Sequence, residues 1–132
     1  MVRGTRAVPQ VYATKEFTRI ARRQGIEDEK LCEAANRAER GLIDADLGGC
    51  LIKQRVPRKG QGRRGGFRVL AAFEPKDLCV FLYSFAKNER DNIDDDELAH
   101  WQKVATAYVH MSPEKLGQLI ENDELREIKC DA

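Results

Sequence analysis

The sequence predicts an α+β protein in which two N-terminal helices pack on a small twisted antiparallel sheet, with further helices at the C-terminus. Three observations lead to this fold class. Apolar residues recur at helical spacing before residue 41 and after residue 94, whereas they alternate with a period of two over residues 50–56 and 67–73. A Pro-Lys-Asp turn at residues 75–77 joins the last two predicted strands as a hairpin. With 132 residues, 42% of them apolar, the chain is expected to form one domain, residues 1–132, around a single core.

Two helices are expected in the first third of the chain. Residues 1–11 are basic but lack the apolar core of a secretory signal, and we interpret them as a loose lead-in. The first helix then covers residues 12–24 and ends at Gly25, and the second covers residues 28–40 and ends at Gly41. The outer face of the first helix carries Arg19, Arg22 and Arg23. We interpret these arginines as a solvated helix face in preference to a second phosphate-binding patch.

Three strands are expected in the middle of the chain, over residues 50–56, 67–73 and 78–86. The third strand is apolar on both faces, which is typical of a central strand that is covered on both sides. The second and third strands form the hairpin, and residues 57–66 form the long loop between the first two strands.

Residues 94–132 are predicted to form a helical C-terminal extension. Asp94 opens a helix, with Glu97 at the reciprocal position of a capping box. Its apolar stripe consists of Leu98, Trp101, Val104, Ala105 and Tyr108. We interpret this stripe as core packing in preference to a base-stacking platform. Ser112 and Pro113 begin a last short helix.

The cysteines are expected to be free thiols. They are Cys32, Cys50, Cys79 and Cys130. They form no Cys-x-x-Cys pair, and with only His100 and His110 to add they do not resemble a zinc site. Four unpaired thiols suit a reducing cytoplasm, and no apolar run approaches the roughly 20 residues of a membrane span. We therefore expect a cytoplasmic protein without a metal or another cofactor.

Positive charge gathers in one segment of a chain whose net charge is only +1. Between Lys53 and Arg68 there are seven Lys or Arg and no Asp or Glu, and glycines interrupt the run. A Gly-rich basic segment in a nearly neutral protein is typical of polyanion binding, with a phosphate backbone as the first candidate. The loop lacks the Lys-Ser ending of a P-loop and leads into a strand, which argues against a nucleotide cradle.

The strand pattern orients three of these cations. Lys53 and Arg55 fall on one face of the first strand, and Arg68 points away from the apolar face of the second. If the three share one side of the sheet, they form a single positive surface. That outcome depends on the strand register, which the sequence leaves open.

RNA cleavage is one of the few reactions that such cations can promote. When a 2′-OH attacks its adjacent phosphate, the protein must position that phosphate, stabilise a pentacovalent transition state and move protons. Arginines offer forked donors to the non-bridging oxygens, and a lysine or tyrosine can transfer protons. The simpler alternative, which composition alone favours, is that the cations only contact phosphates or solvent.

Four short motifs occur in a fixed order after the two predicted helices. They are Leu47-Gly48-Gly49, Ile52-Lys53-Gln54-Arg55, Gly65-Gly66-Phe67-Arg68, and Phe85-Ala86-Lys87 followed by Arg90. In this order and spacing the chain resembles the RelE/ParE superfamily of bacterial type II toxins, in particular the HigB-like RelE branch. The resemblance covers roughly residues 17–109.

The resemblance implies a RelE-like fold and a toxin that cleaves mRNA without a metal, commonly in the ribosomal A site. A cognate antitoxin silences such a toxin, and we expect it to be a small helix-turn-helix protein. The implied catalytic residues are Lys53, Arg55, Arg68, Lys87 and Tyr83. The implied RNA contacts are Arg58, Lys59, Arg63, Arg64 and Arg90. Tyr83 stands in for a C-terminal tyrosine or histidine of other members, and the general acid and base stay unassigned.

Two other functions stay open. Some relatives in the superfamily poison DNA gyrase, and the fold alone does not separate them from the nucleases. A non-catalytic regulator that binds a protein or a nucleic acid through the same basic patch is the other alternative. The density of cations on the predicted sheet and loop favours RNA cleavage.

Overall fold

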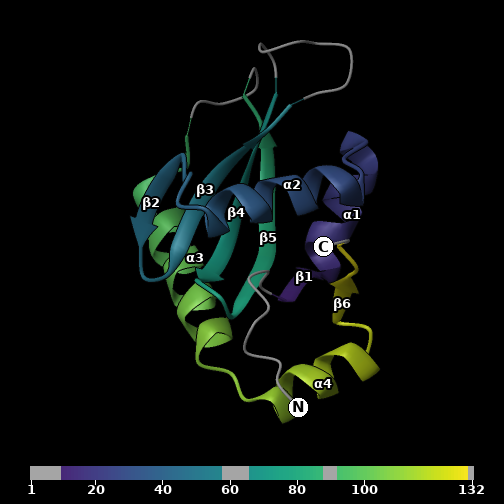
Figure 1. The fold of residues 1–132 in the computed structure, drawn as a ribbon. Coiled ribbons are helices and arrows are strands. Elements are labelled where there is room, and N and C mark those ends of the chain that lie inside the picture. Colours follow the sequence, from purple (N-terminus) through teal and green to yellow (C-terminus); the bar gives the residue numbers. More distant parts are fainter. Residues whose placement is uncertain (1–9, 58–65, 88–91, 131–132) are drawn as a thin grey trace.

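The computed structural model describes residues 10–57, 66–87 and 92–130 (Figure 1). Its strands are β1 (Gln10–Thr14), β2 (Ala45–Gly48), β3 (Leu51–Val56), β4 (Phe67–Glu74), β5 (Leu78–Ala86) and β6 (Leu125–Ile128). Its helices are α1 (Lys15–Gln24), α2 (Asp28–Glu39), α3 (Asp95–Val109) and α4 (Pro113–Glu121). None of the helices in these ranges has the length and apolarity that crossing a membrane requires.

The strands form one six-stranded sheet in the order β2-β3-β4-β5-β1-β6. All neighbouring strands are antiparallel except β1 and β5, which run parallel. The α+β class is therefore confirmed, whereas the predicted small antiparallel sheet is corrected to a larger, mixed sheet that is mostly antiparallel. The central position of β5 is confirmed, and nearly all of its residues are buried.

Strand β1 lies where the sequence predicted the end of a lead-in and the start of a helix. The described part of the predicted lead-in, Gln10 and Val11, belongs to this strand, and so does the start of the predicted helix over residues 12–24. Thr14 ends the strand and caps α1, because its hydroxyl accepts a hydrogen bond from the Phe17 N–H at 3.0 Å. The helix therefore begins at Lys15, and the apolar residues before it pack between β5 and β6.

Helices cover both faces of the sheet, and each face has its own core (Figure 1). On one face α1 and α2 bury Phe17, Ala21, Leu31 and Ala34, and on the other face α3 and α4 pack over the sheet. The predicted arrangement, in which two N-terminal helices pack on a small sheet, is thus corrected to a sheet between two helical layers. An apolar strand such as β5 requires this second layer, because both of its faces must be shielded from water.

The α3 predictions are confirmed. The Asp94 side chain accepts a hydrogen bond from the Glu97 N–H, and the Glu97 carboxylate accepts one from the Asp94 N–H, which completes the capping box. Ala105 is fully buried, and the other members of the apolar stripe pack against the second core. The stripe is therefore core packing, as predicted.

A buried glutamine fixes the orientation of β3. The Gln54 amide nitrogen donates to the carbonyls of Ala34 (3.0 Å) and Leu42 (3.2 Å), and its oxygen accepts from the Asp44 N–H (2.8 Å). These three bonds satisfy a side chain that is only 1% exposed. Because alternate residues of a strand point to opposite faces, anchoring Gln54 toward α2 directs Lys53 and Arg55 to the other face.

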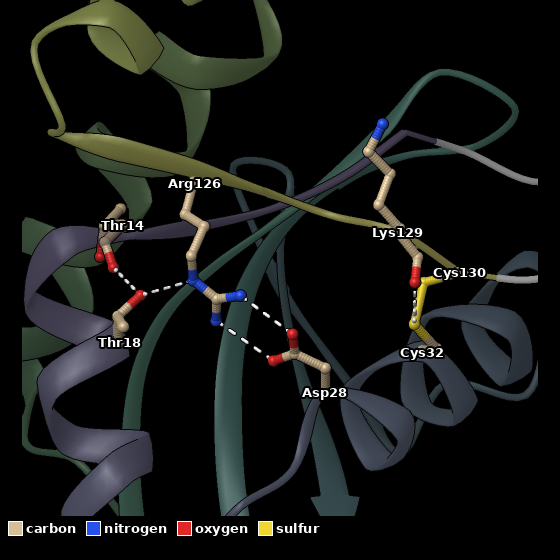
Figure 2. A network of polar contacts seen from close by, with 7 residues as sticks. All are labelled: Thr14, Thr18, Asp28, Cys32, Arg126, Lys129 and Cys130. Carbon is tan, nitrogen blue, oxygen red and sulfur yellow. Dashed lines mark hydrogen bonds and ion pairs between the residues drawn. A yellow bond between two sulfur atoms is a disulfide. The ribbon is translucent and has the colours of Figure 1, made fainter.

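The C-terminal strand is fastened to both N-terminal helices (Figure 2). Arg126 in β6 binds the two carboxylate oxygens of Asp28 at 2.9 and 3.2 Å, and its Nε donates to the Thr18 hydroxyl at 3.4 Å. A disulfide joins Cys32 in α2 to Cys130, 98 residues later in the chain. The prediction of four free thiols is therefore wrong, and Cys50 and Cys79 are the free cysteines. Sequence spacing did not reveal this pair because only the fold brings its members together.

The buried Cys79 thiol is expected to make the stability of the fold fall at alkaline pH. Burial raises the pKa of Cys79 from 9.0 to about 12, and the Glu39 carboxylate adds to the rise. Between these values the native state binds more protons than the unfolded chain, so this contribution to stability is complete below pH 9 and is lost as the pH rises toward 12. We expect the urea midpoint to fall between pH 9 and pH 11.

The Cys79→Ala variant isolates the contribution of this thiol. Burial also raises the pKa of Tyr12 and Tyr108, so part of the alkaline decline is expected to persist without Cys79. The variant should lose less of its unfolding free energy between pH 9 and pH 11 than the wild type loses. Equal losses in both proteins would show that the thiol does not titrate with unfolding.

Candidate nucleic-acid interface

The strand register brings the three sheet cations onto one face. Arg55 pairs directly with Arg68 across β3 and β4, and Lys53 pairs with Leu70. Cross-strand partners point to the same side of an antiparallel sheet, so all three cations share the side on which α3 packs. The single positive surface that depended on register is therefore present.

The cations belong to a grid of six side chains on β3, β4 and β5. One row is Arg55, Arg68 and Phe85, and the next row is Lys53, Leu70 and Tyr83. Strand geometry places neighbouring members of a row about 5 Å apart and the two rows about 7 Å apart. We call this set the cationic grid.

The two arginines of the grid, Arg55 and Arg68, face each other across β3 and β4. Like charges directly opposite in a sheet destabilise it. Within the described ranges neither the Arg55 nor the Arg68 guanidinium forms an ion pair. The Asp44 carboxylate lies beside Arg55, but it accepts the Arg55 backbone N–H at 2.6 Å and pairs with Arg37 at 3.7 Å. An anion between the two guanidiniums would remove this repulsion, so the pair is suited to a phosphate.

An aromatic row extends from the grid onto α3. Tyr83 stacks on Trp101 with ring centroids 5.4 Å apart, and Phe85 lies 6.2 Å from Tyr83. The His100 ring meets the Trp101 ring at its edge, 4.7 Å away. The prediction of core packing for Trp101 did not include this contact with the grid. The sequence could not reveal it, because the stack joins residues from different elements.

Three further observations concern the edge of the grid. The Lys53 ammonium lies 3.5 Å from the side-chain oxygen of Asn92. Lys87 is exposed just beyond β5, and its N–H donates to the Gly66 carbonyl at 3.0 Å. The predicted RNA contacts Arg58, Lys59, Arg63, Arg64 and Arg90 lie outside the described residues. The structure thus brings together Lys53, Arg55, Arg68 and Tyr83, with Lys87 at the end of the same strand as Tyr83.

Family comparison identifies the chain. The family model described as RelE toxin of the RelE / RelB toxin-antitoxin system matches residues 9–128. The chain belongs to the RelE toxin family. The predicted membership of the RelE/ParE superfamily is confirmed, and the match extends beyond residues 17–109 at both ends. The HigB-like branch stays a prediction. No curated protein gives a match to this RelE-family chain.

The Leu47-Gly48-Gly49 motif of this RelE-family protein spans the end of β2 and the first residue of the turn into β3. Gly48 and Gly49 have φ values of 85° and 62°, a left-handed conformation that glycine adopts at little cost. Gln102 in α3 donates to the Leu47 carbonyl at 2.7 Å, and Thr106 donates to the Gly49 carbonyl at 3.0 Å. The motif therefore positions the start of β3, the strand that carries Lys53 and Arg55.

The glycine before β4 allows close approach of the strands next to the arginine pair. A Cβ on Gly66 would lie 2.9 Å from the Val56 carbonyl oxygen, which is backbone and cannot turn aside. We expect Gly66→Ala to lower the free energy of unfolding by about 1–3 kcal/mol, because the strand ends must separate. Urea denaturation measures this loss.

Gly117 supplies the matched control. It lies inside α4, and a Cβ there would meet nothing within 4 Å. Gly117→Ala is expected to raise the free energy of unfolding by about 0.5–1 kcal/mol, since alanine favours helices. If Gly66→Ala were as stable as the wild type, close approach would not be the reason for this glycine.

Proposed function

We propose that this RelE-family toxin inhibits translation in the cytoplasm by cutting mRNA on the ribosome. A cognate antitoxin, expected to be a small helix-turn-helix protein, would silence it. The observation that carries the proposal is the cross-strand pair of Arg55 and Arg68, whose guanidinium groups form no ion pair within the described ranges. Its two forked donors suit the non-bridging oxygens of a phosphate at which negative charge develops.

The proposed reaction uses a nucleophile from the substrate. The 2′ oxygen forms a bond to the adjacent phosphorus while the bond from phosphorus to the 5′ oxygen breaks. One proton leaves the 2′-OH and one is delivered to the 5′ oxygen, so the products carry a 2′,3′-cyclic phosphate and a 5′-OH. The protein has to hold the phosphate, stabilise its charge and transfer two protons, and this route requires no metal ion.

The grid offers a residue for each task. Arg55 and Arg68 are proposed to hold the scissile phosphate. Lys53 and Tyr83, in the neighbouring row, are the proposed groups for proton transfer. Lys87, exposed at the end of β5, is proposed as a further catalytic contact to phosphate. The stack of Tyr83 on Trp101 supports this assignment, because it restrains the tyrosine ring beside the cations.

Induced expression without the antitoxin tests the proposal. The wild type should arrest growth and translation, and primer extension should map new 5′ ends within messages only where ribosomes are present. Arg68→Ala and Lys53→Ala should relieve the arrest. Undiminished toxicity in both variants would overturn the proposal. An SOS response with cleaved DNA complexes would indicate a gyrase poison, and RNA binding without cuts would indicate a non-catalytic regulator.

A further inference from the structure

Helix α1 carries a second line of positive charge away from the grid. Lys15, Arg19, Arg22 and Arg23 are spaced i, i+4, i+7 and i+8, which places them within about 100° of arc at 100° per residue. All four are exposed, whereas Phe17 and Ala21 on the opposite side are buried in the first core. We call these four residues the α1 stripe.

Within the part of the chain that the structure describes, the stripe differs from three other cations in forming no ion pair. Lys30 pairs with Glu33, Arg37 with Asp44, and Arg126 with Asp28. Among the described residues no ion pair involves a member of the stripe, and Glu16, the one acid in α1, forms none with them.

Helix stability does not account for the stripe. Like charges three or four residues apart on a helix repel one another, and Arg19 has such neighbours in Lys15, Arg22 and Arg23. The helix dipole favours Arg22 and Arg23 in the last turn but disfavours Lys15 in the first. An anionic ligand that binds the stripe would relieve this repulsion, and the relief would contribute to the free energy of binding.

The end of α1 is tied to the strand that carries part of the grid. The Ser84 hydroxyl donates to the Gln24 side chain at 2.7 Å, and Ser84 lies between Tyr83 and Phe85 in β5. Ser84 points to the α1 face, and its two neighbours in the grid point to the α3 face. A folded RNA that surrounds the protein can therefore contact the stripe while another strand occupies the grid.

We propose that the α1 stripe binds the phosphate backbone of structured RNA, separately from the strand that is cut. Three of its four members are arginines, whose forked donors match phosphate oxygens. This inference rests on the proposed function, since it assigns to the stripe the task of holding the toxin on the RNA that presents its substrate.

The test compares two triple variants for binding to purified 70S ribosomes over a series of salt concentrations. Arg19→Gln, Arg22→Gln and Arg23→Gln together remove three charges from the stripe. Lys103→Gln, Lys115→Gln and Lys129→Gln remove the same charge from exposed positions elsewhere. Each lost phosphate contact should reduce the slope of log K against log salt by about 0.7–0.9. The slope for the stripe variant should therefore be smaller by about 2–3, and the variant should bind at least about tenfold more weakly at physiological salt. The control should stay near the wild type.

The outcomes separate this inference from the function on which it rests. If the wild type neither binds ribosomes nor cuts mRNA, the proposed function and this inference fail together. If the wild type cuts but both triple variants bind ribosomes alike, the stripe is not an RNA contact and only the inference fails. Unchanged ribosome binding with loss of antitoxin binding would assign the stripe to a protein partner and also overturn the inference. Neither variant should melt below the wild type, since no ion pair among the described residues is lost.

Discussion

Replacing Arg55 or Arg68 by glutamine is expected to slow mRNA cleavage by about 10²–10³-fold in each case. The two side chains face each other across β3 and β4, so each variant removes one of two forked donors from the proposed phosphate position. Single-turnover cleavage on programmed ribosomes measures the effect. The fold should not weaken, because each change also removes a like-charge repulsion.

Two further variants control this experiment. Arg68→Lys keeps the charge but loses the fork, so its rate should lie between those of the wild type and Arg68→Gln. Lys103→Gln removes an exposed charge from α3 and should cleave at the wild-type rate. If the Arg55→Gln/Arg68→Gln double variant retained full activity, the cationic grid would have no part in cleavage.

Loss of the Cys32–Cys130 disulfide is expected to cost about 2–5 kcal/mol of unfolding free energy. The bond closes a loop of 98 residues, and long loops gain most from closure in the chain-entropy description. Without it, β6 is held by its pairing with β1 and by the Arg126–Asp28 ion pair. Urea unfolding of Cys32→Ser, and of the wild type with and without a dithiol reductant, measures the loss.

Counting the thiols that react before and after reduction tests whether the disulfide is present. Alkylation of the denatured, non-reduced protein should label two of the four cysteines, Cys50 and Cys79, and reduction should expose the other two. Cys50→Ser should retain the disulfide and its stability. Four reactive thiols before reduction, or an unchanged midpoint in Cys32→Ser, would contradict this role.

The elements predicted most accurately are those long enough to show a hydrophobic period or a cap within their own residues. The expected boundaries of β3, β4, β5 and α2, and the expected start of α3, agree with the structure to within one or two residues, because each carries a clear period or a cap. The four-residue strands β2 and β6 are too short to show a period, and β1 was read as lead-in and helix because its pairing with β5 is distant in sequence.

The same distinction between local pattern and tertiary contact applies to the residues of the candidate site. The common face of Lys53 and Arg55 follows from alternation within one strand and was predicted. The direct opposition of Arg55 and Arg68 is a matter of register between strands, which alternation does not fix. Two other contacts, the stack of Tyr83 on Trp101 and the Cys32–Cys130 bond, join residues from separate elements. Such contacts depend on tertiary structure, and no local sequence pattern predicts them.

The identity of the nucleophile tests the central claim most directly. A message with a single 2′-deoxy nucleotide immediately before the mapped cut site is placed on ribosomes with the wild-type toxin, beside the all-RNA message in the same buffer. If the grid promotes attack by the substrate's own 2′-OH, the all-RNA message is cut to give a 5′-OH product and the substituted site stays intact. Cleavage at the deoxy site, or a 5′-phosphate on the product, would contradict the mechanism proposed for Arg55 and Arg68.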